Sequence, residues 1–264
     1  MTDNEPNTCG ICQGTMRHIF RARILRRHDV DYHQCGTCDF IRTETPYWLN
    51  EAYSEAISRT DTGLVARNIS ISRALTIVLF TFFDTQGRYL DVAGGTGLLT
   101  RLMRDIGFDF YWDDPYCANV HAQGFAATGT GGPPFEAVTA IEALEHSIEP
   151  VEFVRAAIGK SATGTLLFTT ELFRNRTPAP DWWYYSFPTG QHISFFSRRT
   201  LEALAHTLGL NFVSDGALHM YTRQPIRERP YLKALAKADK IYAKALGRLV
   251  SRTQADNRLM LDDH

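Results

Sequence analysis

The stretch LDVAGGTG, residues 90–97, decides the fold of this chain. It follows Tyr89 and begins inside a short apolar run, 89–92, that is typical of a buried strand. A helical pattern covers 98–106, and Gly107 is placed to cap that helix at its C-terminus. Glycines between a strand and a helix let the backbone approach a ligand, and the helix N-terminus offers free N–H groups. The stretch therefore predicts a ligand-binding turn, although an ordinary strand–turn–helix has the same pattern.

The rest of the chain places this turn in an α/β domain. Strand-like segments follow at 108–112, 137–141 and 165–170, and helical stretches follow at 150–158 and 199–208. A further helical pattern, 47–83, precedes the first strand. This alternation predicts a Rossmann-like, mostly parallel sheet with helices on both faces.

An acidic residue supports a nucleotide-type ligand. Asp114 lies 17 residues after Gly97, at the end of the second predicted strand. In dinucleotide-binding folds, an acid at about this place forms hydrogen bonds to the ribose hydroxyls.

Residues 89–115 resemble the first half of class I S-adenosylmethionine-dependent methyltransferases, whose first motif reads acidic-x-Gly-x-Gly-x-Gly. The resemblance implies that Asp91 lies near the methionine part of the cofactor and that Asp114 holds the ribose, with Asp113 as the nearby alternative. Ala93 stands where the family has its first glycine, and alanine disfavours a positive φ. The cofactor-binding set predicted on this basis is Asp91, Ala93, Gly94, Gly95, Gly97, Asp114, Ile141 and Glu142.

A second set of residues resembles the part of the family's site beside the sulfonium. Residues 135–146 resemble its fourth strand and the following turn, with a Glu-x-x-Glu-His sequence at Glu142, Glu145 and His146. His192 lies in a block that resembles the Gln-His-Ile-x-Phe element of the small-molecule branch. An oxygen or nitrogen acceptor with a high pKa needs a base, so His146, His192 and Glu145 are the predicted catalytic residues. Alternatively, Glu145 and His146 only cap the next helix.

No part of the sequence resembles the magnesium triad of catechol-modifying methyltransferases. We therefore expect metal-free, in-line methyl transfer, in which the protein positions the acceptor and excludes water.

Four consecutive aromatic residues lie in a polar insertion of the domain. They could line an acceptor pocket, stack on a sugar or base, or shelter the sulfonium. They could also anchor the insertion to the body of the domain. We assign them to substrate binding: Trp182, Trp183, Tyr184 and Tyr185.

Two Cys-x-x-Cys pairs, Cys9/Cys12 and Cys35/Cys38, are separated by 22 residues. This spacing is typical of a four-thiolate zinc ribbon, and a redox dithiol is the main alternative. The fifth cysteine, Cys117, has no obvious partner, which argues against a secreted disulfide scaffold. Four thiolates leave no open coordination position, so we expect the zinc to be structural.

The chain thus divides into a zinc ribbon (1–45), a methyltransferase domain (46–224) and a C-terminal amphipathic helix with a polar tail (225–264). Basic residues recur along that helix, which could pack on the domain, contact a membrane surface or polyanion, or form a homodimer interface. The N-terminus is polar, and the longest apolar run, 74–83, is about half the length of a membrane span. We therefore expect a cytoplasmic protein without a transmembrane segment.

The net charge of −1 argues against wholesale nucleic-acid binding. We accordingly expect a methyltransferase that acts on a small-molecule or carbohydrate-type (sugar or glycan) acceptor. Two alternatives stay open: an RNA methyltransferase that uses arginines of the ribbon to contact phosphates, and a non-catalytic S-adenosylmethionine-binding module.

Overall fold

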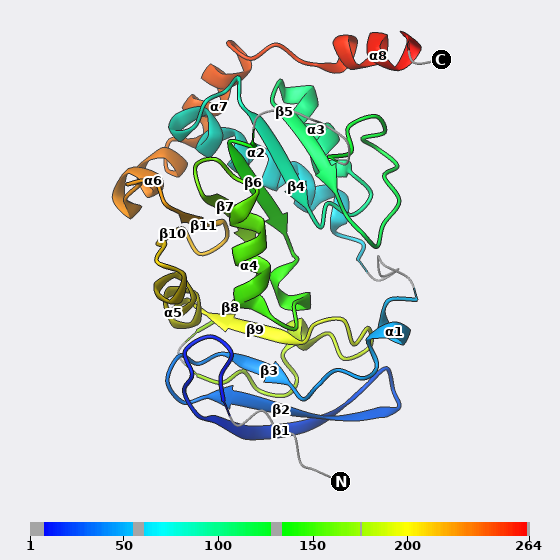
Figure 1. Ribbon diagram of the computed structural model, residues 1–264, viewed down its shortest axis with the longest axis vertical. Helices are drawn as coiled ribbons and strands as arrows, with labels where there is room; N and C mark the ends of the chain where they lie inside the picture. The colour runs from blue at the N-terminus through cyan, green and yellow to red at the C-terminus, as the bar shows by residue number, and fades with distance from the viewer. Residues whose placement is uncertain (1–7, 55–60, 128–133, 175, 263–264) are drawn as a thin grey trace.

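The computed structural model describes residues 8–54, 61–127, 134–174 and 176–262. Two sheets form the body of the molecule, one built mainly from the middle of the chain and one mainly from its N-terminal part (Figure 1). The last helices lie at the end of the molecule that is farthest from the N-terminal sheet (Figure 1).

The central sheet has six strands in the order β10-β11-β7-β6-β4-β5. Their bounds are β4 (Arg88–Val92), β5 (Asp109–Asp113), β6 (Ala137–Ile141), β7 (Thr165–Thr169), β10 (Asn211–Ser214) and β11 (His219–Thr222). β5, β4, β6 and β7 pair in parallel, whereas β11 is antiparallel to both of its neighbours. The four strands predicted from the sequence are confirmed to within one residue at each end. The sequence did not predict β10 and β11.

Helices cover both faces of this sheet, as predicted. The helices on one face are α2 (Leu64–Phe82), α3 (Leu98–Ile106) and α6 (Glu228–Leu235), and those on the other are α4 (Pro150–Gly159) and α5 (Arg198–Leu208). Successive strand residues point to opposite faces. Tyr89 therefore packs in the cluster under α2 and α3, and Leu90 in the cluster under α4.

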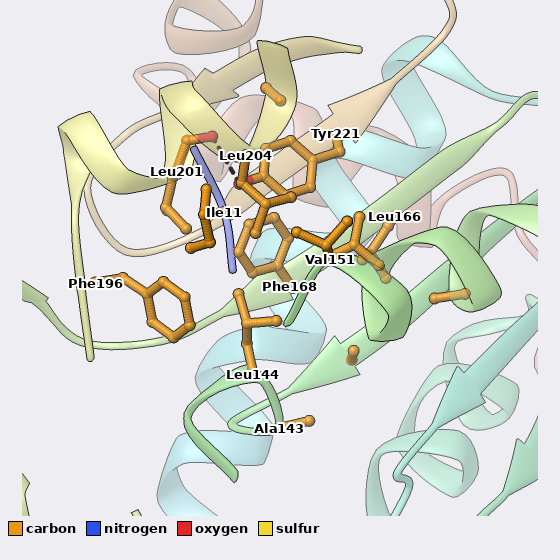
Figure 2. Close-up of a cluster of buried hydrophobic side chains, with 14 of the residues drawn as sticks. Ile11, Ala143, Leu144, Val151, Leu166, Phe168, Phe196, Leu201, Leu204 and Tyr221 are labelled. Carbon is orange, nitrogen blue, oxygen red and sulfur yellow. Dashed lines mark hydrogen bonds between the residues drawn. The ribbon is translucent and has the colours of Figure 1, made fainter. Parts of the chain in front are cut away.

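The core under α4 and α5 also contains residues from the N-terminal part of the chain, Ile11 among them. Figure 2 shows Ile11 among the side chains of Leu201, Leu204 and Phe168. The Tyr221 hydroxyl donates a hydrogen bond to the carbonyl oxygen of Leu201 over 2.8 Å (Figure 2). The cysteine-containing segment is therefore packed into the core of the central domain.

The second sheet has the order β1-β2-β3-β9-β8. Its strands are β1 (Met16–Ile24), β2 (His28–Cys35), β3 (Ile41–Thr43), β8 (Leu172–Phe173) and β9 (Ser194–Ser197). β3 pairs with β9, so the predicted ribbon shares one sheet with residues 172–197, which the division at residue 45 does not anticipate. Aromatic side chains of both segments form its core, including Tyr32, Tyr185 and Phe195.

The helical pattern at 47–83 corresponds to two helices, α1 (Leu49–Ala52) and α2; residues 55–60 lie outside the described part of the chain. Within the described residues, α2 alone has the length and hydropathy that a membrane-crossing helix needs. Its Leu75, Val78 and Leu79 are buried against the sheet. One such helix supports a membrane span only weakly.

The prediction of one C-terminal helix with a polar tail is wrong. The chain forms α6, then α7 (Ala238–Leu246), and then α8 (Thr253–Asp262) in the segment predicted to be a tail. α8 is fixed by Asp256, whose carboxylate accepts hydrogen bonds from Nε and Nη2 of buried Arg104 over 2.8 and 2.7 Å. A buried guanidinium is stable only with such a partner, and no local pattern reveals this pairing.

Candidate functional site

A cleft of about 1150 Å³ lies at the carboxyl ends of β4, β5 and β6. Ligands of open α/β sheets bind at this edge. The predicted site residues that line it are Asp91, Ala93, Gly94, Gly95, Asp114, Ile141, Glu142, His146, Trp183, Tyr184 and His192. The predicted residues that do not line it are Gly97, Glu145, Trp182 and Tyr185.

The turn between β4 and α3 has the backbone geometry that its glycines predict. Gly95 has φ +54° and Gly97 has φ +83°. A Cβ on Gly97 would lie 2.6 Å from Oδ1 of Asn119, so this position requires glycine. Ala93, the departure from the family motif, also has a positive φ, +52°, which costs a non-glycine residue roughly 1–2 kcal/mol. The turn is therefore held in a strained conformation next to the cleft.

Of the two acids at the end of β5, Asp114 is the one in the cleft. Its carboxylate accepts backbone N–H groups of Gly95 over 2.9 Å and of Tyr116 over 2.7 Å, which ties the end of β5 to the turn. Asp113 instead pairs with Nζ of Lys160 over 2.5 Å.

Asp91 lies buried beneath the turn, and Oγ1 of Thr139 donates a hydrogen bond to its Oδ1 over 2.6 Å. Burial raises the pKa of Asp91 to about 7; the hydrogen bond from Thr139 opposes this rise, and the charge of Asp114 adds to it. A cationic group of a ligand beside Asp91 would favour its ionised form.

The predicted histidines come together at the other end of the cleft. His146 belongs to the short helix η1 (Leu144–His146), which follows β6. The N–H of Ile193 donates to the carbonyl oxygen of Glu145 over 2.9 Å, which aligns the segment before β9 with η1. The ring centroids of His146 and His192 are consequently 4.9 Å apart. No side-chain hydrogen bond caps α4, so Glu145 and His146 do not have the alternative role of capping that helix.

Both histidines use Nδ1 for contacts within the protein. Nδ1 of His192 lies 2.7 Å from the carbonyl oxygen of Tyr184, and Nδ1 of His146 lies 3.1 Å from that of Gln191. A carbonyl oxygen only accepts hydrogen bonds, so Nδ1 of His192 carries the hydrogen and its neutral ring keeps the lone pair on Nε2. Nδ1 of His146 also lies 3.0 Å from the Tyr53 hydroxyl, which can donate to it, so each tautomer of His146 has a partner. Burial, and to a lesser extent the charge of His146, lower the pKa of His192 to about 3.

Two carboxylates accompany these histidines. Glu145 is fully buried, and neither of its carboxylate oxygens has a hydrogen-bond partner among the described residues. Glu142 has φ +50° and accepts a hydrogen bond from Oγ1 of Thr169 over 2.6 Å. Burial, reinforced by the charge of Glu145, raises the pKa of Glu142 to about 7. Two carboxyl groups thus lie beside the two imidazoles, and burial favours the protonated form of Glu142.

The aromatic stretch 182–185 is divided between the two roles considered for it. Trp183 is 72% exposed at the rim of the cleft, and Tyr184 lines the cleft from a buried position. Trp182 and Tyr185 instead pack in the core of the second sheet, where the rings of Tyr185 and Phe195 are 4.9 Å apart.

The cleft residues that were not predicted include Tyr53, Arg67 and Tyr116. Tyr116 is strongly exposed, and its ring stacks on that of Tyr53 with centroids 5.8 Å apart. The position of Tyr116 two residues after Asp114 is the one signal that could have identified it, because the chain there still follows the edge of the sheet.

The four paired cysteines form a compact cluster. The Sγ atoms of Cys9 and Cys38 are 3.6 Å apart, those of Cys12 and Cys35 are 3.5 Å apart, and all four lie within 4.8 Å of one another. Tetrahedral zinc with Zn–S bonds of about 2.3 Å requires sulfurs about 3.8 Å apart. The N–H of Ile11 also points at Sγ of Cys9 over 3.4 Å. The cluster therefore fits a zinc ion.

Residues 66–215 match the family model described as "Methyltransferase domain". This match covers more than half of the chain. The chain therefore belongs to this family, the class I S-adenosylmethionine-dependent methyltransferases, as the resemblance of residues 89–115 implied.

The solved structures that resemble the chain do so at low identity. CalO1, a methyltransferase in calicheamicin biosynthesis with bound SAH, is 14% identical with a TM-score of 0.43, and the match covers 65% of this chain and 59% of that one. An O-methyltransferase family protein from Burkholderia thailandensis is 14% identical with a TM-score of 0.46, covering 67% and 63%. The chain thus spans about three-fifths of the length of these two proteins. No curated protein sequence matches it significantly.

Proposed function

We propose that this protein transfers a methyl group from S-adenosylmethionine to a small-molecule or carbohydrate-type acceptor. One observation carries the proposal: a single cleft contains the glycine turn with Asp91 and Asp114, and also the two histidines and Trp183. S-adenosylmethionine supplies a methyl group on a positively charged sulfur, from which an acceptor oxygen or nitrogen displaces it in line while the sulfur keeps the bonding electron pair.

The residues around the turn suit the two ends of this cofactor. Oδ2 of Asp114 accepts one backbone hydrogen bond, from Gly95, and keeps a lone pair for a ribose hydroxyl. Buried Asp91 offers a carboxylate to the cationic methionine end, and charge pairing there would offset the cost of ionising it.

The rim of the cleft suits a ring-shaped acceptor. Trp183 and Tyr116 are both largely exposed there, and aromatic faces stack well against sugar or planar rings. His146 and His192 lie deeper, where the acceptor must lose its proton. In the metal-free mechanism predicted from the sequence, His146 takes that proton, because His192 with a pKa of about 3 is too weak a base.

The RNA alternative is disfavoured by the charges on the ribbon. Arg21 donates to Asp31 over 2.7 Å, and Arg23 donates to Asp29 over 2.9 Å. These arginines of the β1–β2 hairpin are therefore already paired, which weakens the predicted phosphate-binding surface.

We also propose that the four cysteines hold a structural zinc ion. The ion would join the loop at 9–12 to the loop at 35–38. Cys38 is in turn bound to α5, since its carbonyl oxygen accepts a hydrogen bond from Oγ1 of Thr200 over 2.7 Å. Zinc would thus fix the ribbon on the central domain.

Calorimetric titration with S-adenosylmethionine, S-adenosylhomocysteine and NAD tests the proposal. We expect micromolar dissociation constants for the first two and no binding of NAD. If neither S-adenosylmethionine nor S-adenosylhomocysteine binds, the cofactor assignment is refuted. Binding without methyl transfer to any sugar, glycan or other small-molecule acceptor would favour the non-catalytic module. Salt-dependent RNA binding would favour the RNA alternative.

A further inference from the structure

Glu145, His146 and His192 each place one ligand atom within 4.8 Å of the others. We propose that these three residues bind a divalent first-row transition-metal ion at the acceptor end of the cleft. This site is separate from the cysteine cluster and comes from different parts of the chain.

The carboxylate of Glu145 indicates a missing cation. It is fully buried, and neither oxygen has a hydrogen-bond partner within the described ranges, which is costly for an ionised group. Arg67 is the positive side chain that acts on Glu145, but its Nη1 and Nη2 already donate to Asp61 over 3.0 and 2.6 Å. Glu142 lies nearby, and burial favours its protonated form. Because Arg67 is paired with Asp61, Glu145 lacks a cation of its own among the described residues, and a divalent ion would supply one.

The histidines are oriented as metal ligands. A metal-binding imidazole normally donates the hydrogen of its other nitrogen to a carbonyl or carboxylate oxygen, which fixes the tautomer and the ring. Nδ1 of His192 has this contact with the carbonyl oxygen of Tyr184, and Nδ1 of His146 has it with that of Gln191. His192 therefore keeps the Nε2 lone pair for a metal ion. His146 does so in the tautomer that donates to Gln191, in which the Tyr53 hydroxyl, 3.0 Å from the same Nδ1, is not the donor.

The ligand set indicates the kind of metal and its use. Two imidazoles and one carboxylate suit manganese, iron, cobalt or zinc, and they leave coordination positions open. His146 and His192 line the cleft, so an acceptor hydroxyl could occupy an open position. The cation would lower the pKa of that hydroxyl, whose proton would pass to water. His146 would then be a metal ligand and not the base. Metal-assisted loss of the acceptor's proton would thus replace the metal-free mechanism predicted from the sequence.

Titration with Mn²⁺ of protein that carries one equivalent of zinc, enough for the cysteine cluster alone, tests the site when it is followed by electron paramagnetic resonance. Mn²⁺ prefers oxygen and nitrogen ligands and does not displace zinc from four thiolates. We expect one bound Mn²⁺ per chain, and at least a tenfold loss of affinity in Glu145→Gln and in His192→Gln. His206→Gln is the matched control, because His206 lies exposed on α5 away from the cleft, and it should bind Mn²⁺ like the wild type.

Absence of Mn²⁺ binding to the wild type would overturn the proposal. So would a Mn²⁺ affinity in both ligand variants that equals the affinity of the wild type. If the variants do not fold, NMR of the wild type decides: bound Mn²⁺ should broaden the ring signals of His146 and His192 and spare those of His206. Broadening elsewhere would refute the site. The measurement needs neither acceptor nor methyl transfer, so its failure leaves the cofactor titration unaffected.

Discussion

Replacing Asp91 with asparagine tests how the cofactor turn is stabilised. Burial raises the pKa of Asp91 from 3.8 to about 7 in the folded protein. Between these values the unfolded chain has released this proton while the folded chain still holds it. The free energy of unfolding of the cofactor-free protein should therefore fall as the pH rises from about 4, and level off above 7.

The size of the effect follows from the gap between the two pKa values. One pKa unit corresponds to about 1.4 kcal/mol. Between pH 5 and pH 8, roughly two pH units lie below the folded-state pKa of about 7 and above the unfolded-state pKa, and stability changes over these two units. The ionisation of Asp91 should thus cost the wild type about 2–3 kcal/mol over this range. Asparagine does not titrate, and its amide oxygen can still accept the hydrogen bond from Thr139. The stability of Asp91→Asn relative to the wild type should rise by the same amount.

Urea unfolding of both proteins at pH 5 and pH 8, without cofactor, measures this difference. Other titrating groups cancel in the comparison because both proteins contain them. At pH 8, Asp91→Asn should also bind S-adenosylmethionine more weakly, since it cannot offer a negative charge. An unchanged stability difference between the two pH values would refute the argument that burial controls the ionisation of Asp91.

Three further predictions concern acids and cysteines. Asp114→Ala should weaken S-adenosylmethionine binding roughly tenfold or more in calorimetry, because a charged hydrogen-bond acceptor is lost. Asp113→Ala should change the affinity for S-adenosylmethionine less than about twofold. If the two variants lost affinity equally, Asp114 would be removed from the ribose site. Cys35→Ser should abolish zinc binding and lower methyl transfer more than cofactor affinity; a wild type that contains no zinc after purification without chelator would contradict the ribbon. Asp256→Ala should destabilise the protein by about 1–3 kcal/mol in urea unfolding, because buried Arg104 loses the hydrogen bonds from Nε and Nη2 while its pair with Asp109 remains. Exposed Asp239→Ala is its control and should stay within about 0.5 kcal/mol.

The sequence predicted well those elements whose signal is local. The helix expected at 98–106 is α3, and Gly107 ends it with φ +126°. The strand expected at 137–141 is β6. Periodicity, apolar runs and glycine caps describe each of these elements without reference to any distant residue, which explains their accuracy.

The missed features depend on contacts between distant residues. α8 lies in a segment that reads as polar, and it is fixed by the ion pair between Asp256 and Arg104. β10 and β11 are short, and neither their pairing with each other nor the pairing of β11 with β7 can be read from their own residues. Within the aromatic stretch, burial of Tyr185 and exposure of Trp183 depend on the sheet that passes beneath them, which the local composition does not reveal.

The shared second sheet relates the cysteine cluster to the chemistry of the cleft. β3, which follows the second cysteine pair, pairs with β9 at Ile41 and Phe195. His192 lies two residues before β9, and the N–H of the next residue, Ile193, donates a hydrogen bond to the carbonyl oxygen of Glu145. The ribbon therefore supports the strand that positions one of the two histidines, whereas Asp91 and the glycine turn belong to the central sheet alone. Loss of the metal should disturb the acceptor end of the cleft before the cofactor end, which is why we expect methyl transfer to be more sensitive to Cys35→Ser than cofactor binding.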